Sequence, residues 1–131
     1  MKKYRNIFDQ IEKSVSDYNK VKITYLPIPH LSIEKWALTK GHRDSASFKE
    51  EDKKLKEIID TENKQLRTRN QNGSTYAPNL NADLVRSRSK NGKQRYSINL
   101  NLLKDGVHAG VNISKVWGAN ISRCIVDQCS C

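Results

Sequence analysis

The sequence predicts an α/β fold in which helices alternate with a few short, parallel strands. Apolar residues recur at helical spacing in residues 4–19, 47–70 and 113–125, with charged residues between them. A short run of β-branched and aromatic residues, 21–26, follows the first of these segments after only a residue or two. A helix that passes so quickly into a strand is typical of parallel-sheet domains.

The first strand, residues 21–26, is expected to be buried. It ends at the Pro-Ile-Pro of residues 27–29, because proline lacks the N–H that a sheet requires. Residues 30–46 show no sustained period and predict an irregular loop with one helical turn. The long middle helix is expected to begin at a capping box formed by Ser47 and Glu50.

The second half of the chain is less regular. Residues 70–79 are rich in Asn, Gly and Ser and predict a loop, after which a second strand is expected in residues 80–86. The Lys-Asn-Gly-Lys of residues 90–93 predicts a turn. Residues 96–103 are expected to be extended or to form a short turn that leads into Asp105.

The chain has 131 residues, the size of one domain. Two strands cannot make a stable parallel sheet, because such a sheet needs several neighbouring strands and both faces covered. Residues 1–131 are therefore expected to form one partial domain. Its partner is either a missing segment or a second copy that pairs with the exposed sheet edge.

The chain is basic, with 24 Lys and Arg against 14 Asp and Glu and a net charge of +10. Residues 84–104 contain six basic residues and no acidic one, which favours an anionic partner. The candidate polyanion-binding residues are Arg86, Arg88, Lys90, Lys93 and Arg95. They predict weak, salt-sensitive binding to nucleic acid, in which Tyr96 could stack on a base.

Several functional classes lack a sequence signal. The three cysteines lie in the last eight residues, and the spacing of His30, His42 and His108 matches no metal-binding arrangement, so neither a metal nor another cofactor is expected. A supporting site role remains open for His30, which follows the end of the first strand. No apolar run approaches a membrane span or the core of a signal peptide, so the chain is expected to be cytoplasmic.

The segment Asp105-Gly-Val-His108 carries the most informative chemistry. A carboxylate three residues before a histidine can reach the imidazole in a tight turn, which Gly106 permits. The carboxylate then fixes one ring nitrogen and leaves the other free as a general base. The pattern also fits a simpler structure, in which Asp105 closes a turn and His108 is half-buried.

Residues 96–108, Y-S-I-N-L-N-L-L-K-D-G-V-H, resemble the end of SGNH/GDSL-type hydrolases. The last motif of that family is a leucine, one or more spacers and D-G-x-H, followed by a C-terminal helix such as the one carrying Val116 and Trp117. Residues 21–29 resemble the fourth strand of the family, and residues 47–70 resemble the long helix after it. The resemblance covers nearly all of the chain but only the second half of the family's domain.

This resemblance implies an acyl-ester hydrolase on a partial flavodoxin-like three-layer α/β/α fold, with His108 as general base and Asp105 as its orienting partner. The family's nucleophilic serine lies in a G-D-S motif, and its oxyanion hole uses a glycine and an asparagine from two middle motifs. The chain contains neither G-D-S nor G-x-N-D, and its Asn72-Gly-Ser lies in the wrong place. Since oxyanion stabilisation alone is often worth about 10²–10³ in rate, the chain by itself is expected to be inactive. The alternative function is a basic interaction protein that binds nucleic acid or other polyanions through residues 84–104.

Overall fold

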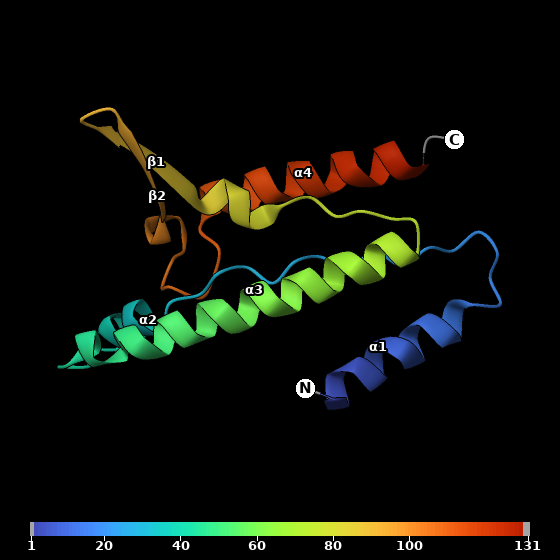
Figure 1. Ribbon diagram of the computed structural model, residues 1–131, viewed down its shortest axis with the longest axis horizontal. Helices are drawn as coiled ribbons and strands as arrows, with labels where there is room; N and C mark the ends of the chain where they lie inside the picture. The colour runs from blue at the N-terminus through green and yellow to red at the C-terminus, as the bar shows by residue number, and fades with distance from the viewer. Residues whose placement is uncertain (1, 130–131) are drawn as a thin grey trace.

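The computed structural model describes residues 2–129, and the side chains from residue 6 onward. Its helices and strands are α1 (Lys2–Val15), α2 (Ile33–Thr39), α3 (Lys49–Asn72), β1 (Val85–Lys90), β2 (Lys93–Ile98) and α4 (Val111–Cys129). The helices α4, α3 and α1 lie one beside the next, and β1 and β2 project from one end of α4 (Figure 1). Mixed α and β structure is confirmed, but the sheet in this part of the chain is a single antiparallel pair. The expected parallel strands and three layers are not seen there.

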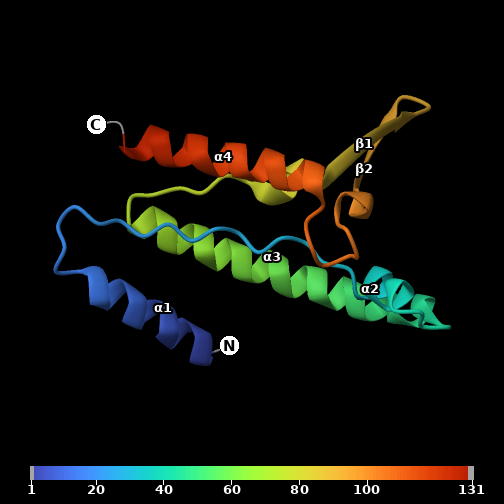
Figure 2. The same ribbon diagram turned by 180° about the vertical axis from the view of Figure 1, so that it is seen from behind.

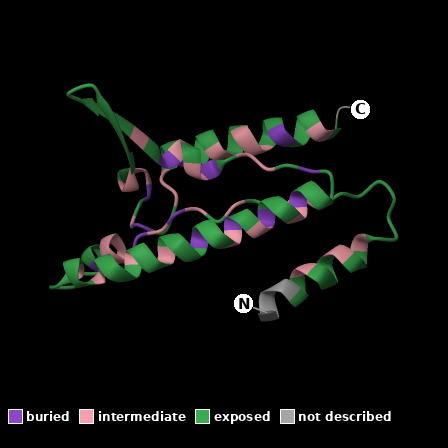
Figure 3. Cartoon of the chain, viewed as in Figure 1, coloured by how far each residue is buried: buried purple, intermediate pink, exposed green. Residues whose placement is uncertain are grey.

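Residues 21–30 run extended along α3 without pairing with another strand, as both views of the ribbon show (Figure 2). The prediction of a buried strand at residues 21–26 is therefore right about the extended backbone but wrong about the sheet and about burial, since none of these residues is buried and Val21 and Leu26 are exposed. The helix α3 buries one stripe of side chains, and two of its members are asparagines (Figure 3). This stripe consists of Ile59, Asn63, Leu66 and Asn70.

The two asparagines of α3 bind the extended segment much as a neighbouring strand would. The Asn63 amide accepts a hydrogen bond from the backbone N of Ile28 at 2.6 Å and donates one to its carbonyl oxygen at 2.9 Å. Asn70 makes the same pair of contacts with Tyr25, at 2.8 and 2.9 Å. Because buried backbone groups require partners, these side chains hold residues 25–28 extended without a second strand.

The first helix, predicted for residues 4–19, ends at Val15 and meets α3 through charged side chains, whereas Ile7 and Ile11 of its apolar face are exposed. Arg69 of α3 donates hydrogen bonds to Asp9 at 3.0 Å and to Glu12 at 3.1 Å. The ring of Phe8 meets the ring of Tyr25 edge to face, with 5.0 Å between centroids. These contacts place α1 on the outer side of α3, at the end remote from the β1–β2 hairpin (Figure 1).

The start of α3 differs from the expected capping box. The helix begins at Lys49, and its N-cap residue Phe48 makes no side-chain capping hydrogen bond. Ser47 belongs to a preceding 3-10 turn, Ser45–Phe48, and donates its hydroxyl to the Asp44 carbonyl at 2.8 Å. The backbone N–H groups of the first turn of α3 are thus not satisfied by the predicted pair of side chains.

The second strand also lies later in the chain than the prediction for residues 80–86. Leu80–Leu84 forms a 3-10 turn, which Asn79 caps by accepting from the backbone N of Ala82 at 3.3 Å. The predicted turn at residues 90–93 is confirmed, since Asn91 and Gly92 have φ angles of 53° and 74° between β1 and β2. Two consecutive positive φ values join antiparallel strands with the twist that a hairpin requires.

The hydrophobic core near the hairpin is small and joins three separate segments. Leu84 at the end of the 3-10 turn, Leu103 and Ile113 of α4 are buried against one another. Partly buried side chains surround them, namely Ile98, Leu100, Leu102, Ala109 and Trp117. This cluster lies directly before and after residues 105–108 and therefore fixes both ends of the Asp105–His108 loop.

The closing helix α4 confirms the prediction for residues 113–125 and extends it at both ends. Cys124 is buried, with its sulfur 3.1 Å from the carbonyl oxygen of Tyr76, whereas Cys129 is exposed and Cys131 lies outside the described residues. Between residues 2 and 129 no helix is long and apolar enough to cross a membrane.

Candidate functional site

The Asp105–His108 loop is a tight turn that its own backbone closes. The N–H of Lys104 donates to the carbonyl oxygen of His108 at 2.7 Å, and an isolated bridge pairs Leu103 with Ala109. Gly106 has a φ of +85°, a left-handed conformation that glycine adopts without strain. The turn is thus closed by hydrogen bonds within seven residues, which is why a short motif could predict its local conformation.

The carboxylate of Asp105 orients both the backbone and the ring of His108. One oxygen, Oδ1, accepts from the backbone N of Val107 at 3.0 Å and of His108 at 2.8 Å. The other, Oδ2, lies 2.7 Å from Nδ1 of the His108 ring. Asp105 and His108 therefore lie next to each other as expected. One oxygen of Asp105 closes the turn, and the other contacts the ring of His108.

The electrostatics of the pair favour an ionised carboxylate. Hydrogen bonds from the backbone and ring of His108 hold the pKa of Asp105 well below its usual range. An ionised carboxylate can only accept, so Nδ1 of the ring donates to it, and the neutral form of the ring has its lone pair on Nε2. The side chain of His108 is 66% exposed and that of Asp105 only 16%, so the free ring edge faces solvent while its partner is sheltered.

The helix α2 forms the support under this loop. Its N-cap residue Ser32 donates its backbone N–H to the Gly106 carbonyl at 2.8 Å. Lys35 donates through Nζ to the carbonyl oxygens of Leu100 and Leu103, the latter at 2.9 Å. A Cβ added to Gly106 would lie 2.7 Å from the Ser32 carbonyl oxygen, so the backbone of the loop touches the backbone of α2.

A second carboxylate, Asp52 of α3, fixes α2 in turn. Its oxygens accept from the backbone N–H groups of Ile33 and Glu34 and from the hydroxyl of Ser32. Negative charge at a helix N-terminus is favourable because the first N–H groups of a helix lack partners within it. A chain of contacts therefore runs from α3 through α2 to the loop of His108.

Sequence reasoning missed this support. The prediction of an irregular loop with one helical turn at residues 30–46 is wrong for Ile33–Thr39, which is helical throughout. Ser32 followed by Lys35 and Trp36 on a short apolar stretch was the available signal for a capped helix. Trp36 lies beside the site, with its ring 6.3 Å from the imidazole of His108 and tilted by 55°.

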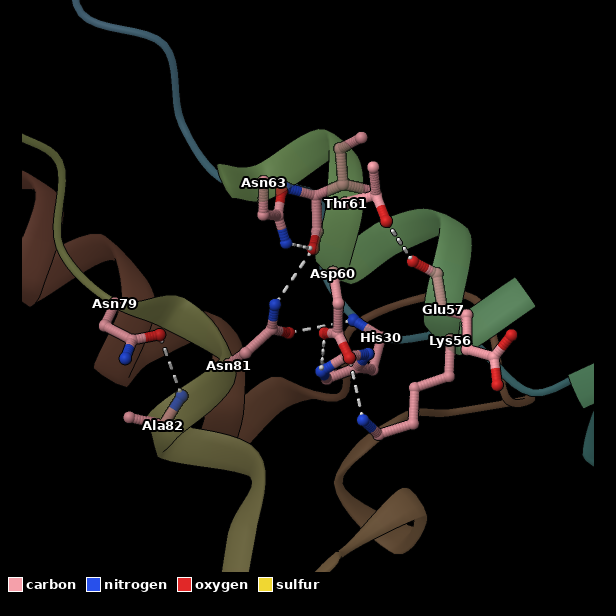
Figure 4. A network of polar contacts seen from close by, with 10 residues as sticks. His30, Lys56, Glu57, Asp60, Thr61, Asn63, Asn79, Asn81 and Ala82 are labelled. Atoms are coloured by element: carbon pink, nitrogen blue, oxygen red, sulfur yellow. Dashed lines mark hydrogen bonds and ion pairs between the residues drawn. The ribbon is translucent and has the colours of Figure 1, made fainter. Parts of the chain in front are cut away.

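His30 does not join the Asp105–His108 pair but belongs to a separate polar network (Figure 4). Its backbone N donates to Asn81 at 2.8 Å, and its Nε2 lies 3.5 Å from a carboxylate oxygen of Asp60. Nδ1 of its ring is buried and has no hydrogen-bond partner. Burial lowers the pKa of His30, although Asp60 opposes that shift, so the ring is neutral in the folded protein at neutral pH.

We expect this burial to make stability depend on pH. An unfolded histidine has a pKa of about 6.5, so protonation of His30 on acidification favours the unfolded chain. The neutral His30 ring therefore makes its full contribution to stability at a pH above the unfolded pKa. That contribution is lost as the pH falls from the unfolded pKa to the lower pKa of the folded state. Urea unfolding of wild type and His30→Gln at pH 7.5 and 5.5 measures the effect. On going from pH 7.5 to 5.5, the free energy of unfolding of wild type should fall more than that of His30→Gln. An equal fall in both proteins would contradict the burial argument.

The five candidate polyanion-binding residues all lie on the β1–β2 hairpin. Arg86, Arg88 and Lys90 are on β1, and Lys93 and Arg95 are on β2. The hairpin projects away from the helices, and every residue of it except Arg86 and Ile98 is exposed (Figures 1 and 3). It follows the 3-10 turn at Leu84 and leads within a few residues to Asp105.

Among the described residues, no group of three or more His, Cys, Asp or Glu could hold a metal ion, and no hydrogen bond reaches Nε2 of His108. Comparisons with protein-family models, curated proteins and solved structures found no match to this chain. What the chain does is therefore inferred from its own residues and their geometry.

Proposed function

We propose that this chain supplies the Asp–His part of an SGNH-like ester hydrolase site. The observation that carries the proposal is the 2.7 Å contact between Asp105 Oδ2 and His108 Nδ1, in an exposed ring whose Nε2 has no hydrogen bond from any described residue. A carboxylate, an imidazole and an open ring nitrogen in this order form the base half of a triad. The D-G-x-H motif before the closing helix α4 supports the family assignment.

In this proposal His108 is the general base that accepts a proton, whereas Asp105 remains an ionised carboxylate throughout. Nε2 of His108 accepts the proton of an attacking hydroxyl, and the ring then carries a positive charge between its two nitrogens. The Asp105 carboxylate stabilises that charge and keeps the ring oriented. The low pKa of Asp105 fits this role, because a carboxylate that stays ionised does not compete for the transferred proton.

The attacking hydroxyl and the oxyanion donors must come from another segment, because the chain contains neither G-D-S nor G-x-N-D. Residues 21–26 offer a place for that segment. Side chains of α3 and of the segment after it bind the backbone of Ile23, Tyr25, Ile28 and His30. The backbone of Thr24 and Leu26, in contrast, bonds to no described residue. We propose that a strand of the missing half pairs here and completes a flavodoxin-like three-layer sheet.

Nitrogen NMR of the histidine rings tests the acid–base role. In wild type, the neutral form of the His108 ring should show the tautomer with the proton on Nδ1 and the lone pair on Nε2. Asp105→Asn should reduce that preference, because an amide can donate to Nδ1 as well as accept from it. A wild-type ring protonated mainly on Nε2 would exclude His108 as the base of this site.

The rate of hydrolysis of p-nitrophenyl acetate tests the missing nucleophile. The chain alone should exceed His108→Ala by no more than it exceeds His42→Ala, because each exposed imidazole gives only a slow background and the chain has no G-D-S serine. Turnover by the wild-type chain that His108→Ala abolishes would mean that the chain carries its own nucleophile. His42→Ala is the matched control, because it removes a histidine from the exposed loop after α2.

A further inference from the structure

The β1–β2 hairpin carries all five of its basic side chains on one face. In an antiparallel pair, residues directly opposite share a face and successive residues alternate between faces. Arg88 lies opposite Arg95, and Lys90 lies opposite Lys93. Arg86, two residues before Arg88, shares that face and lies opposite Ser97. The alternation of basic and polar residues along both strands thus becomes one continuous basic face.

This arrangement is unfavourable for the hairpin alone. Like charges directly opposite one another destabilise a strand pair, and the hairpin contains two such pairs in succession. None of the five basic side chains forms an ion pair or side-chain hydrogen bond within the described part of the chain. Their charges therefore have no internal partner, and an external anion would remove the repulsion between them.

The opposite face of the hairpin has a different character. It presents Ser87, Ser89, Gln94 and Tyr96, none of them charged at neutral pH, and Tyr96 donates its hydroxyl to Gln94 at 2.7 Å. Binding of single-stranded nucleic acid combines cations with aromatic rings on which bases stack. Because Tyr96 lies away from the cations, the basic face fits a partner that presents phosphates rather than bases.

We infer that the basic face of the β1–β2 hairpin binds double-stranded DNA without regard to its sequence. A two-stranded ribbon fits the major groove of B-form DNA, which is about 12 Å wide, whereas the major groove of A-form RNA is too narrow to admit it. Three cations spaced two residues apart cover about 14 Å of β1, so they can reach successive phosphates. This inference is independent of the role proposed for Asp105 and His108.

Fluorescence anisotropy with a labelled DNA duplex of random sequence tests the inference. If all five cations contact phosphates, the logarithm of affinity should fall with that of salt concentration with a slope of about −4.5. Affinity should then drop about 500-fold between 50 and 200 mM salt. The double variant Arg88→Gln with Arg95→Gln should reduce the slope by about 1.8 and keep the fold, since it removes one repulsive pair.

The matched control removes two charges elsewhere. Lys53 and Lys54 are exposed on α3 and form no ion pair with any residue from 6 to 129. The double variant Lys53→Gln with Lys54→Gln therefore has the same net charge as the hairpin variant. This control should leave the slope close to that of wild type. An equal loss in both variants would overturn the inference in favour of net charge alone. Tighter binding to single-stranded DNA than to the duplex would also overturn the inference if Tyr96→Ala weakened it. So would tighter binding to anionic vesicles than to duplex DNA.

Discussion

Replacing Gly106 by alanine is expected to lower the free energy of unfolding by about 2–5 kcal/mol. A residue with a Cβ in the left-handed region, where Gly106 has its φ of +85°, costs about 1–2 kcal/mol. Overpacking adds about 1–3 kcal/mol, since the new Cβ would lie 2.7 Å from the Ser32 carbonyl oxygen and 2.9 Å from Lys35 Cβ. Urea unfolding followed by circular dichroism measures the change.

The control for this prediction is Gly92→Ala in the hairpin turn. Gly92 has a φ of +74°, but a Cβ there would meet nothing within 4 Å. Gly92→Ala should therefore lower the free energy of unfolding only by the strain of a left-handed alanine, about 1–2 kcal/mol. The difference between the two variants isolates the close approach of the Asp105–His108 loop to α2. Equal losses would show that this approach contributes nothing to stability.

Replacing Leu103 by alanine is expected to destabilise the protein by about 2–5 kcal/mol, the usual cost of a cavity at a buried leucine. Leu103 is 1% exposed and packs with Leu84 and Ile113 at the junction of three segments. It also comes two residues before Asp105, and Lys35 donates to its carbonyl oxygen. The substitution should therefore loosen the loop of His108 as well as lower the urea midpoint.

Leu38→Ala provides the comparison for Leu103. Leu38 has the same side chain, but it is 63% exposed on α2. Its replacement should change the free energy of unfolding by no more than about 0.5 kcal/mol, because surface substitutions remove little packing. If both variants lost the same stability, the cluster around Leu103 would not be the core of this part of the protein.

The candidate site was predictable to the extent that it is local. Asp105 and His108 are three residues apart, and the turn that joins them depends on Gly106 and on nearby backbone contacts. The support from Lys35 and Asp52 was not predictable in the same way. Lys35 reaches carbonyl groups 65 and 68 residues further along the chain, and no periodicity within α2 indicates such a distant partner.

The polyanion-binding residues show how much depends on strand position. The sequence identified all five cations and the turn between them, but it placed the strand at residues 80–86. The strand in fact covers Val85–Lys90, and in this register the alternation of basic and polar residues determines which side chains share a face. Weak apolar content in Val85–Lys90 explains the error, because an exposed hairpin lacks the hydrophobic pattern by which strands are usually detected.

The amino-acid sequence alone determined the structures that close over a few residues, namely the helices α1, α3 and α4, the Asn91-Gly92 turn and the Asp105–His108 loop. The backbone hydrogen bonds that close each of them join residues a few positions apart, so residue type and spacing suffice to predict their local conformation, although α2 also contacts the loop at Gly106. The tertiary structure decided the rest. Residues 21–30 have the composition of a strand, yet they bind the amides of Asn63 and Asn70 across 35 and 45 residues. Such pairings depend on which helix face packs against the segment, and only the folded chain specifies that.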